Sequence, residues 1–223
     1  MGRKAMANDQ PSYDTFWDVE THSARPNDTS FSVKVARSLN DLMQVTAVRA
    51  AVFLSEQVCP YYEEFDGNDF CATHLIGYRG FEPVACLRAR FFADFAKLER
   101  LAVRHEFRDS RISFQIVRAG IELARKKGYR RIYGHAQDRL VPFWSRFGAR
   151  PMSNQRKLVF SDFSYTEMLL ETEPHPNPVT LDSDPYEIIR PEGAWHRPGP
   201  LDRSADRPVT SPLMDFTFDS AVS

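Results

Sequence analysis

The chain has 223 residues, 42% of them hydrophobic and 26% charged, with a formal net charge of -1. This length suffices for one well-buried core with tails, and the near-zero charge argues against nucleic acid as the main partner. Without a run of 18 apolar residues or a signal-peptide core, we expect a soluble cytoplasmic protein with no membrane span.

The first part of the chain predicts a polar arm, a strand and a helix. Residues 1–30 show no sustained period and are expected to form a flexible arm. Residues 31–36 alternate as in a strand. Ser38 or Asn40 can then cap a helix, because their side chains accept hydrogen bonds from backbone N–H groups. The expected buried side of this helix carries Leu42, Val45, Val48, Arg49 and Val52.

A loop rich in carboxylates and tyrosines follows at residues 55–69, with the sequence SEQVCPYYEEFDGND. On composition alone, it is most simply a solvated acidic loop. Cys59, Cys71 and Cys86 are odd in number and lack metal-ligand spacing. We therefore expect reduced structural thiols and no metal site.

The middle of the chain predicts most of a sheet. Residues 72–78 and 84–92 suit an antiparallel meander, and 98–103 form a further short strand. Asp109 or Ser110 is expected to cap the next helix, which should end at Gly128. The apolar side of that helix carries Ile112, Ile116, Ala119, Leu123 and Ala124.

Three more strands are expected at residues 131–135, 157–160 and 165–170. Together these elements predict an α/β (α+β) fold, with a mixed central sheet of about seven strands flanked by helices.

Residues 171–223 differ in composition, since they hold nine of the fifteen prolines. No long helix is expected there. We expect an irregular tail that packs on the domain, or on a second subunit as a homodimer contact, through a few apolar anchors. These are Tyr186, Ile188, Ile189, Trp195, Leu213, Phe216 and Phe218.

The strand, polar loop and helix in the middle of the chain suggest a chemistry, because free N–H groups at a helix start bind phosphate. Residues 97–152 resemble the acyl-CoA binding half of the GNAT superfamily of N-acyltransferases. The phosphate loop of that family reads Arg or Gln, two residues, Gly, one residue, Gly or Ala. Here the Arg slot is kept as Arg108, and both small positions are replaced, by Arg111 and Ser113.

Two other segments resemble the ElaA-like branch of that superfamily. The upstream stretch contains VRAAVFLSEQVCPYYEEFDGNDFCATH, and the downstream stretch reads AQDRLVPFWSRFGARP. The resemblance covers residues 31–170 and implies that they form a GNAT domain. It implies an N-acyltransferase (EC 2.3.1.-) that moves an acyl group, most simply acetyl, from acyl-CoA to a primary amine by direct attack on the thioester.

The resemblance also implies how the donor, acetyl-CoA or a longer acyl-CoA, is held. The pantetheine arm would pair with main-chain groups of Leu101, Ala102 and Val103. The phosphates would lie at the loop, and two later residues would complete the donor site. The loop residues are Arg108, Asp109, Ser110, Arg111, Ile112 and Ser113, and the later two are Gln137 and Phe143.

Three catalytic residues follow from the same resemblance. Glu99 is expected as the base or as the holder of a basic water, although it can instead pair across the sheet with Arg88 or Arg90. His74 is a proton carrier or a structural histidine. Many family members protonate the leaving thiolate with a Tyr where this chain has Trp144, so either another group such as Tyr133 or bulk water supplies the proton, or the activity is attenuated.

Two further histidines, His105 and His135, flank the donor loop and are weaker candidates for a direct role.

The acidic loop would form the wall of the acceptor channel in this fold. Several carboxylates in one concave region favour a cationic amine, either a small molecule or an amino-terminal group. The expected acceptor residues are Arg49, Phe53, Glu63, Glu64, Asp66 and Arg88.

Two alternatives remain. Acyl-homoserine-lactone synthases also lack the glycine loop and use an acyl carrier protein as donor. The corresponding residues would be Arg49, Phe53, Asp66, Asp69, Arg88 and Glu99. The altered loop and Trp144 also allow a non-catalytic acyl-CoA-binding or interaction module.

Overall fold

The computed structural model describes residues 30–153, 156 and 158–211. Apart from Ser30, the expected N-terminal arm lies outside these residues, as do the tail anchors Leu213, Phe216 and Phe218.

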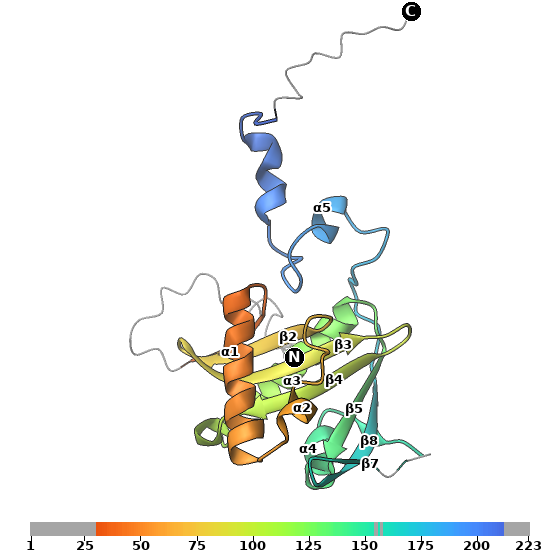
Figure 1. Cartoon of the computed structure of the whole chain (residues 1–223). Helices are drawn as coiled ribbons and strands as arrows, with labels where there is room; N and C mark the ends of the chain where they lie inside the picture. Colours follow the sequence, from red (N-terminus) through yellow and green to blue (C-terminus); the bar gives the residue numbers. More distant parts are fainter. Residues whose placement is uncertain (1–29, 154–155, 157, 212–223) are drawn as a thin grey trace, which may run out of the picture.

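An eight-stranded mixed sheet forms the centre of the domain and confirms the predicted fold (Figure 1). Its order is β1-β2-β3-β4-β5-β8-β6, and β7 pairs with β8. The prediction of about seven strands lacked the two-residue β6. The bounds are β1 Phe31–Val35, β2 Thr73–Arg79, β3 Glu82–Phe91, β4 Ala96–Val103, β5 Arg131–Gln137, β6 Arg150–Pro151, β7 Leu158–Phe160 and β8 Phe163–Glu171.

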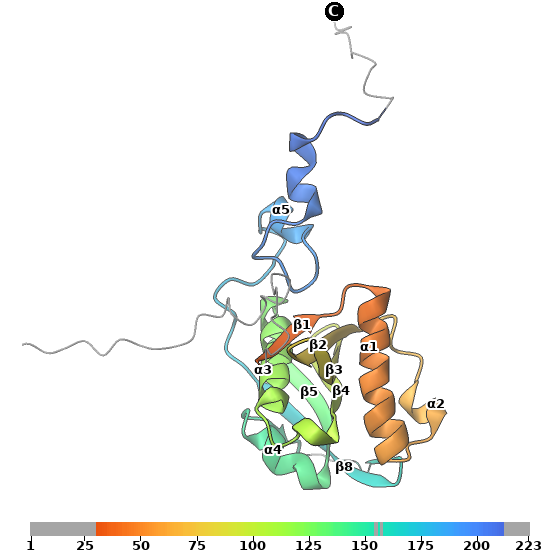
Figure 2. The same cartoon turned by 90° about the vertical axis from the view of Figure 1, so that its left-hand side faces the viewer.

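Helix α1, Leu39–Arg49, covers one face of the sheet (Figure 2). Ser38 caps it as predicted, because its Oγ accepts from Asp41 N at 3.1 Å. The helix continues as a π-helical segment, η2, Ala50–Glu56, which the sequence did not predict. Its apolar side packs on one set of alternating sheet residues. That cluster holds Val45, Val48, Val52, Ile76, Tyr78, Cys86 and Ala102.

Helix α3, Ile112–Lys126, covers the opposite face (Figure 2). It ends before Gly128, whose φ of +87° is the left-handed conformation expected of a glycine after a helix. Gly120 allows close approach to the sheet, because a Cβ there would lie 2.6 Å from Leu87 Cδ2. The predicted buried stripe is confirmed at Ile112, Ile116, Ala119, Leu123 and Ala124.

Short helical segments complete the described chain. They are α2 Tyr61–Glu64, η3 His105–Phe107, η4 Asp138–Leu140, α4 Val141–Ser145, α5 Pro185–Ile188 and η5 Pro200–Asp206. Within the described residues, none of the helices combines the length and apolarity that a membrane crossing requires.

The segment after β8 docks on the C-terminal end of α3. Val179 N donates to Lys126 O at 2.8 Å, and Lys126 Nζ lies 3.0 Å from Glu187 Oε1. Of the predicted anchors, Trp195 is 7% exposed and lies near the Lys127 ammonium.

Three other apolar residues predicted as anchors of this segment are not buried on the domain, and their role as contacts to a second subunit stays a prediction. Tyr186, Ile188 and Ile189 are 43–50% exposed. They lie on or directly after the four-residue α5, which stands away from the sheet (Figure 1).

Replacing Trp195 by Ala should release this extension. Removing a buried Trp side chain costs about 3–5 kcal/mol. We therefore expect proteolysis within residues 180–211 to accelerate by about a hundredfold to a few thousandfold, because cleavage follows the population of the open form. Limited proteolysis followed by mass spectrometry measures this rate. Leu181→Ala is the matched control, since Leu181 is 95% exposed. Equal cleavage of the two variants would contradict the anchoring role.

Candidate functional site

The sheet splits between β4 and β5. These parallel strands pair only at Ala96↔Ile132 and Lys97↔Tyr133. Beyond that point β4 continues along β3, and β5 continues along β8 (Figure 1). Gly134 lies at the start of the split, where a Cβ would lie 3.0 Å from Leu98 O. Main-chain groups on the facing edges are therefore available to an extended ligand that pairs like a strand.

A bulge in β4 shapes one side of the split. Arg100 has a φ of +53°, and the β3–β4 register shifts opposite this position. Such a bulge bends a strand and redirects the residues around it. The predicted donor-binding residues Leu101, Ala102 and Val103 directly follow the bulge.

The loop after β4 ends at a helix start that a side chain caps only at its first N–H group. The N-cap position is Arg111, which makes no side-chain cap hydrogen bond, and is not the expected Asp109 or Ser110. Ser110 Oγ donates to Phe107 O at 2.6 Å and accepts from Ile112 N at 3.4 Å. Further N–H groups of the first turn of α3 have no side-chain cap, which suits an anion.

Two of the loop residues predicted to bind the donor differ in availability. Arg108 Nε donates to Val103 O at 3.0 Å, and its guanidinium pairs with Glu56. Arg111 is exposed. Arg111 is therefore the more available cation for a phosphate group.

The remaining two predicted donor residues lie beyond the split. Gln137 ends β5 and donates to Tyr165 Oη at 3.2 Å. Phe143 lies in α4 and packs on Phe114, with ring centroids 5.2 Å apart. Their roles toward a donor stay predictions.

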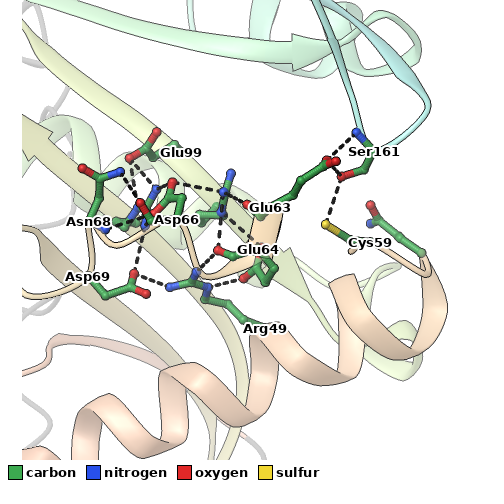
Figure 3. A network of polar contacts seen from close by, with 12 residues as sticks. Arg49, Cys59, Glu63, Glu64, Asp66, Asn68, Asp69, Glu99 and Ser161 are labelled. Carbon is green, nitrogen blue, oxygen red and sulfur yellow. Dashed lines mark hydrogen bonds and ion pairs between the residues drawn. The ribbon is translucent and has the colours of Figure 1, made fainter. Parts of the chain in front are cut away.

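On the α1 face, arginines and carboxylates form a charge cluster that closes one side of the split (Figure 3). It joins α1, the 60–69 loop, β3 and β4. We define the charge cluster as Arg49, Arg88, Lys97 and Arg100 with Glu64, Asp66, Asp69 and Glu99.

Arg88 is the centre of the charge cluster, and its side chain has no exposed surface. Its Nε donates to Glu99 at 2.9 Å. Nη1 donates to Asp66 at 2.8 Å and to Asp69 at 2.9 Å, and Nη2 donates to Asp66 at 2.6 Å. All three donor nitrogens are thus engaged, as burial of a guanidinium requires.

Arg49 and Arg100 extend the charge cluster to the acidic loop. Arg49 pairs with Glu64, and its Nη1 donates to Asp69 at 2.5 Å. Arg100 Nη2 donates to Glu63 O at 2.7 Å and lies 3.1 Å from Asp66 Oδ2.

These pairings reduce the net negative charge that the acidic loop was expected to present. Burial pushes the pKa of Asp66 up, but hydrogen bonds and charge from Arg88 outweigh it and hold that pKa far below its usual value. Asp69 behaves alike, with Arg49 and Arg88 outweighing burial. For Glu64, burial dominates and raises the pKa despite Arg49. The charge cluster contains as many cationic side chains as carboxylates, so the loop has little uncompensated charge.

Glu63 lies apart from this cluster and contacts the β7–β8 turn. Its Oε2 accepts from Ser161 N at 2.9 Å and from Ser161 Oγ at 2.7 Å (Figure 3). Cys59 Sγ lies 2.9 Å from the same hydroxyl. These hydrogen bonds therefore join the acidic loop to the β7–β8 turn. The sequence did not single out Ser161.

Glu99 makes the cross-strand pairing that the sequence analysis kept as its alternative role. Oε1 accepts from Arg88, and Oε2 lies 2.6 Å from Lys97 Nζ. Both carboxylate oxygens are therefore engaged by cations in this structure. Its role as a base stays a prediction.

His74 is buried on β2 beside the charge cluster. Its Nε2 lies 2.9 Å from Asp69 O, and burial lowers its pKa. It is therefore neutral at neutral pH, and this geometry suits a structural histidine. Its proton-carrying role stays a prediction.

On β5, Tyr133 joins His135, a weaker candidate of the sequence analysis, to Glu167, which the sequence analysis did not single out. Tyr133 Oη lies 2.6 Å from His135 Nε2 and donates to Glu167 Oε1 at 2.6 Å. Glu167 lies opposite His135 in the β5–β8 register. Period-2 alternation in the two predicted strands would have assigned each residue to a face, but it does not give the register between the strands.

Trp144 lies on the α3 side of the sheet. With Leu98 and Ile121 it lines an apolar cavity of about 20 Å³. Phe147 lines the same cavity and packs edge-on against Phe143. In this structure Trp144 and Phe147 are therefore packing residues.

Comparisons with known proteins agree with this geometry. Residues 41–149 match the family model described as "Acetyltransferase (GNAT) family". A Bacillus subtilis (strain 168) protein, "Uncharacterized N-acetyltransferase YjcF", is 31% identical over 124 residues, covering 56% of this chain and 89% of the relative.

Two solved structures share the fold. Escherichia coli ElaA has a TM-score of 0.56 and 23% identity, covering 64% of this chain and 100% of ElaA. An acyl-CoA N-acyltransferase from Pseudomonas aeruginosa has a TM-score of 0.57 and 22% identity, covering 63% of this chain and 99% of that one.

Replacing Arg88 by Met should strongly destabilise the domain. Breaking a buried ion pair costs about 3–5 kcal/mol at neutral pH, and here three partner carboxylates lose their shared cation and keep at least one other cation each. Urea unfolding measures this loss. Arg118→Met on the exposed face of α3 is the control and should change little.

The same comparison has a defined pH dependence. The folded pKa of Asp66 is depressed, so its contribution to stability is complete above the unfolded pKa, about 4, and is lost as pH falls toward the folded value. The difference in free energy of unfolding between wild type and Arg88→Met should therefore become smaller as pH falls below about 4. A constant gap down to about pH 2 would contradict the pairing.

Proposed function

This chain belongs to the GNAT acetyltransferase family, and from that premise we propose that it transfers an acyl group, most simply acetyl, from acyl-CoA to a primary amine. The observation that carries the proposal is the split between β4 and β5 beside the first turn of α3. It offers main-chain groups for an amide-bearing chain and an anion site for phosphate at one end.

On the donor side, the pantetheine arm would extend β4 as an added strand along Leu101, Ala102 and Val103. The pyrophosphate would then lie at the first turn of α3, with Arg111 beside it. A side chain at each of the usual glycine positions keeps the backbone from wrapping the phosphates closely. We therefore propose that charge replaces part of the close fit in binding CoA.

On the acceptor side, the channel would lie between the acidic loop and the β7–β8 turn. The attacking amine must be neutral, so a proton acceptor near the split is needed. Because arginines compensate the loop carboxylates, Glu56 included, the preference for a cationic acceptor would depend on Glu63 more than on the charge cluster. The acceptor is proposed to be a small molecule or an amino-terminal amine.

A second candidate is an N-acyltransferase that takes its acyl group from a carrier protein, as acyl-homoserine-lactone synthases do. One observation favours it. Five of the six residues that this reading selected meet in the charge cluster, namely Arg49, Asp66, Asp69, Arg88 and Glu99. A carrier-bound phosphopantetheine has no pyrophosphate to hold, which would agree with the altered loop.

Incubation of the protein with acetyl-CoA and a mixed panel of primary amines tests the proposed reaction. We expect mass spectrometry to find an acetylated amine together with an equal amount of free CoA. CoA binding without any acylated product, including from longer acyl-CoA donors, would contradict catalysis and favour the acyl-CoA-binding module.

The manner of donor binding gives a separate prediction. We expect CoA to bind with a dissociation constant of about 1 µM or weaker, with affinity falling steeply in added salt. Arg111→Ala should weaken CoA binding by about fivefold at low salt, the upper range for one exposed charge pair. Calorimetric titration measures both, and Arg118→Ala is the matched control.

The same titration separates the two donors. Pantetheine lacks the phosphates, so it should bind more weakly than CoA. Its affinity should be the same for wild type and Arg111→Ala. Equal affinity for both ligands, unchanged in Arg108→Ala/Arg111→Ala, would contradict the phosphate site and favour the carrier-protein donor.

A further inference from the structure

Three side chains on β5 and β8 form a hydrogen-bonded chain outside the charge cluster. Tyr133 Oη is the middle atom, 2.6 Å from His135 Nε2 and 2.6 Å from Glu167 Oε1. The Phe160 ring packs beside His135, with centroids 5.6 Å apart. The imidazole orientation is therefore constrained on two sides.

The hydrogens of this chain can be assigned from its chemistry. The hydrogen bond from Tyr133 holds the pKa of Glu167 below its usual value, so Glu167 is an ionised acceptor. Burial, with Glu167 beside it, raises the pKa of Tyr133, which keeps its one proton and donates it to Glu167. The hydroxyl oxygen must then accept from His135, so His135 carries its hydrogen on Nε2.

The other ring nitrogen of His135 is consequently a lone-pair acceptor. Burial lowers the pKa of His135, and the charge of Lys97 lowers it further, so the ring is neutral at neutral pH. Within the part of the chain that the structure describes, the hydrogen bond of the His135 ring is the one at Nε2, and Nδ1 has no hydrogen-bond partner. A neutral imidazole with one bare nitrogen is the usual form of a histidine base.

The position of His135 matches the place where such a base is needed. Tyr133 is the last β5 residue paired with β4, so His135 is the first residue beyond the split on the same face of β5. The charged groups that act on it come from both sides, namely Lys97 and Glu99 of β4 and Glu167 of β8. Glu99 itself has both oxygens engaged by cations.

We propose that His135 is the catalytic base of the acyl transfer, and that Tyr133 and Glu167 are positioning residues that fix its tautomer. The inference rests on the proposed function. The amine nitrogen attacks the thioester carbonyl carbon, a C–N bond forms, and the C–S bond breaks. The amine proton moves to Nδ1, and the imidazolium then gives that proton to the thiolate sulfur, so amide and thiol leave and the ring returns to its neutral form.

This assignment also provides an acid for the leaving thiolate, a role that the Trp144 side chain cannot fill. One imidazole accepts the proton and later returns it, as in hydrolase triads, where a third group holds the tautomer. Glu167 offsets the transient charge through Tyr133.

The first test is the pH dependence of kcat at saturating amine for wild type and His135→Gln. Gln can still hydrogen-bond Tyr133 but is not a base. We expect kcat at pH 7 to fall by about 100-fold to 10,000-fold and the acidic limb to disappear, with CoA affinity unchanged. His175→Gln, a histidine paired with Glu122 on the far part of α3, is the matched control and should keep the wild-type profile. A loss of less than about tenfold would overturn the proposal.

Two further variants separate a base from a structural residue. Glu167→Gln removes a charge that favours the imidazolium, so the acidic limb should move to lower pH. Glu99→Gln should likewise keep the acidic limb of the kcat profile, and that limb should also move to lower pH. Loss of the limb in Glu99→Gln and its retention in His135→Gln would assign the base to Glu99.

A measurement that needs no turnover keeps this inference distinct from the proposed function. Nitrogen-15 NMR of histidine-labelled protein should show His135 protonated on Nε2 and bare on Nδ1 at pH 7, with a pKa below the usual value of about 6.5. Tyr133→Phe should abolish the single tautomer. A wild-type ring protonated on Nδ1 would overturn the inference, whereas the expected tautomer without any amine acylation would contradict only the proposed function.

Discussion

The interruption of strand pairing between β4 and β5 is the constraint on which the site depends. Each strand has a full partner on its other side, so the sheet remains stable while two facing edges separate after Lys97 and Tyr133. Buried main-chain groups without partners are costly. A ligand with an extended amide backbone can satisfy them, and this explains why the donor of the proposed reaction suits this position. Gly134 allows the strands to approach closely at the last paired position before they part.

The charge cluster solves a second problem, which is how to hold an irregular loop over one side of this split. Arg49 and Arg88 are almost fully buried, and such charges are tolerated only when paired and hydrogen-bonded. Their carboxylate partners come mainly from the 60–69 loop, so the pairing that compensates the arginines also fixes the loop. The loop thereby contributes shape and one bridge, between Glu63 and Ser161, more than a negative field.

Sequence reasoning reached the elements because hydrophobic period is a local property. The stripe from Ile112 to Ala124 and the glycine stop at Gly128 were predicted correctly for that reason. The cap of α3 was not, since Ser110 uses its hydroxyl on Phe107 O. The pairing of Glu99 with Arg88 was foreseen as an alternative, because the residues lie on neighbouring predicted strands. The chain from His135 to Glu167 was not foreseen, because it depends on the register between β5 and β8, which two separate period-2 patterns do not determine.

Amide hydrogen exchange with and without CoA tests most directly whether the split is the donor site. If the donor adds to β4 as a strand, the N–H groups of Leu101 to Val103 and of the first turn of α3 should exchange more slowly when CoA is bound. The paired part of β4 before Leu98 should exchange at the same rate in both states. Protection confined to other parts of the chain, with no change along the facing edges of β4 and β5, would contradict the account.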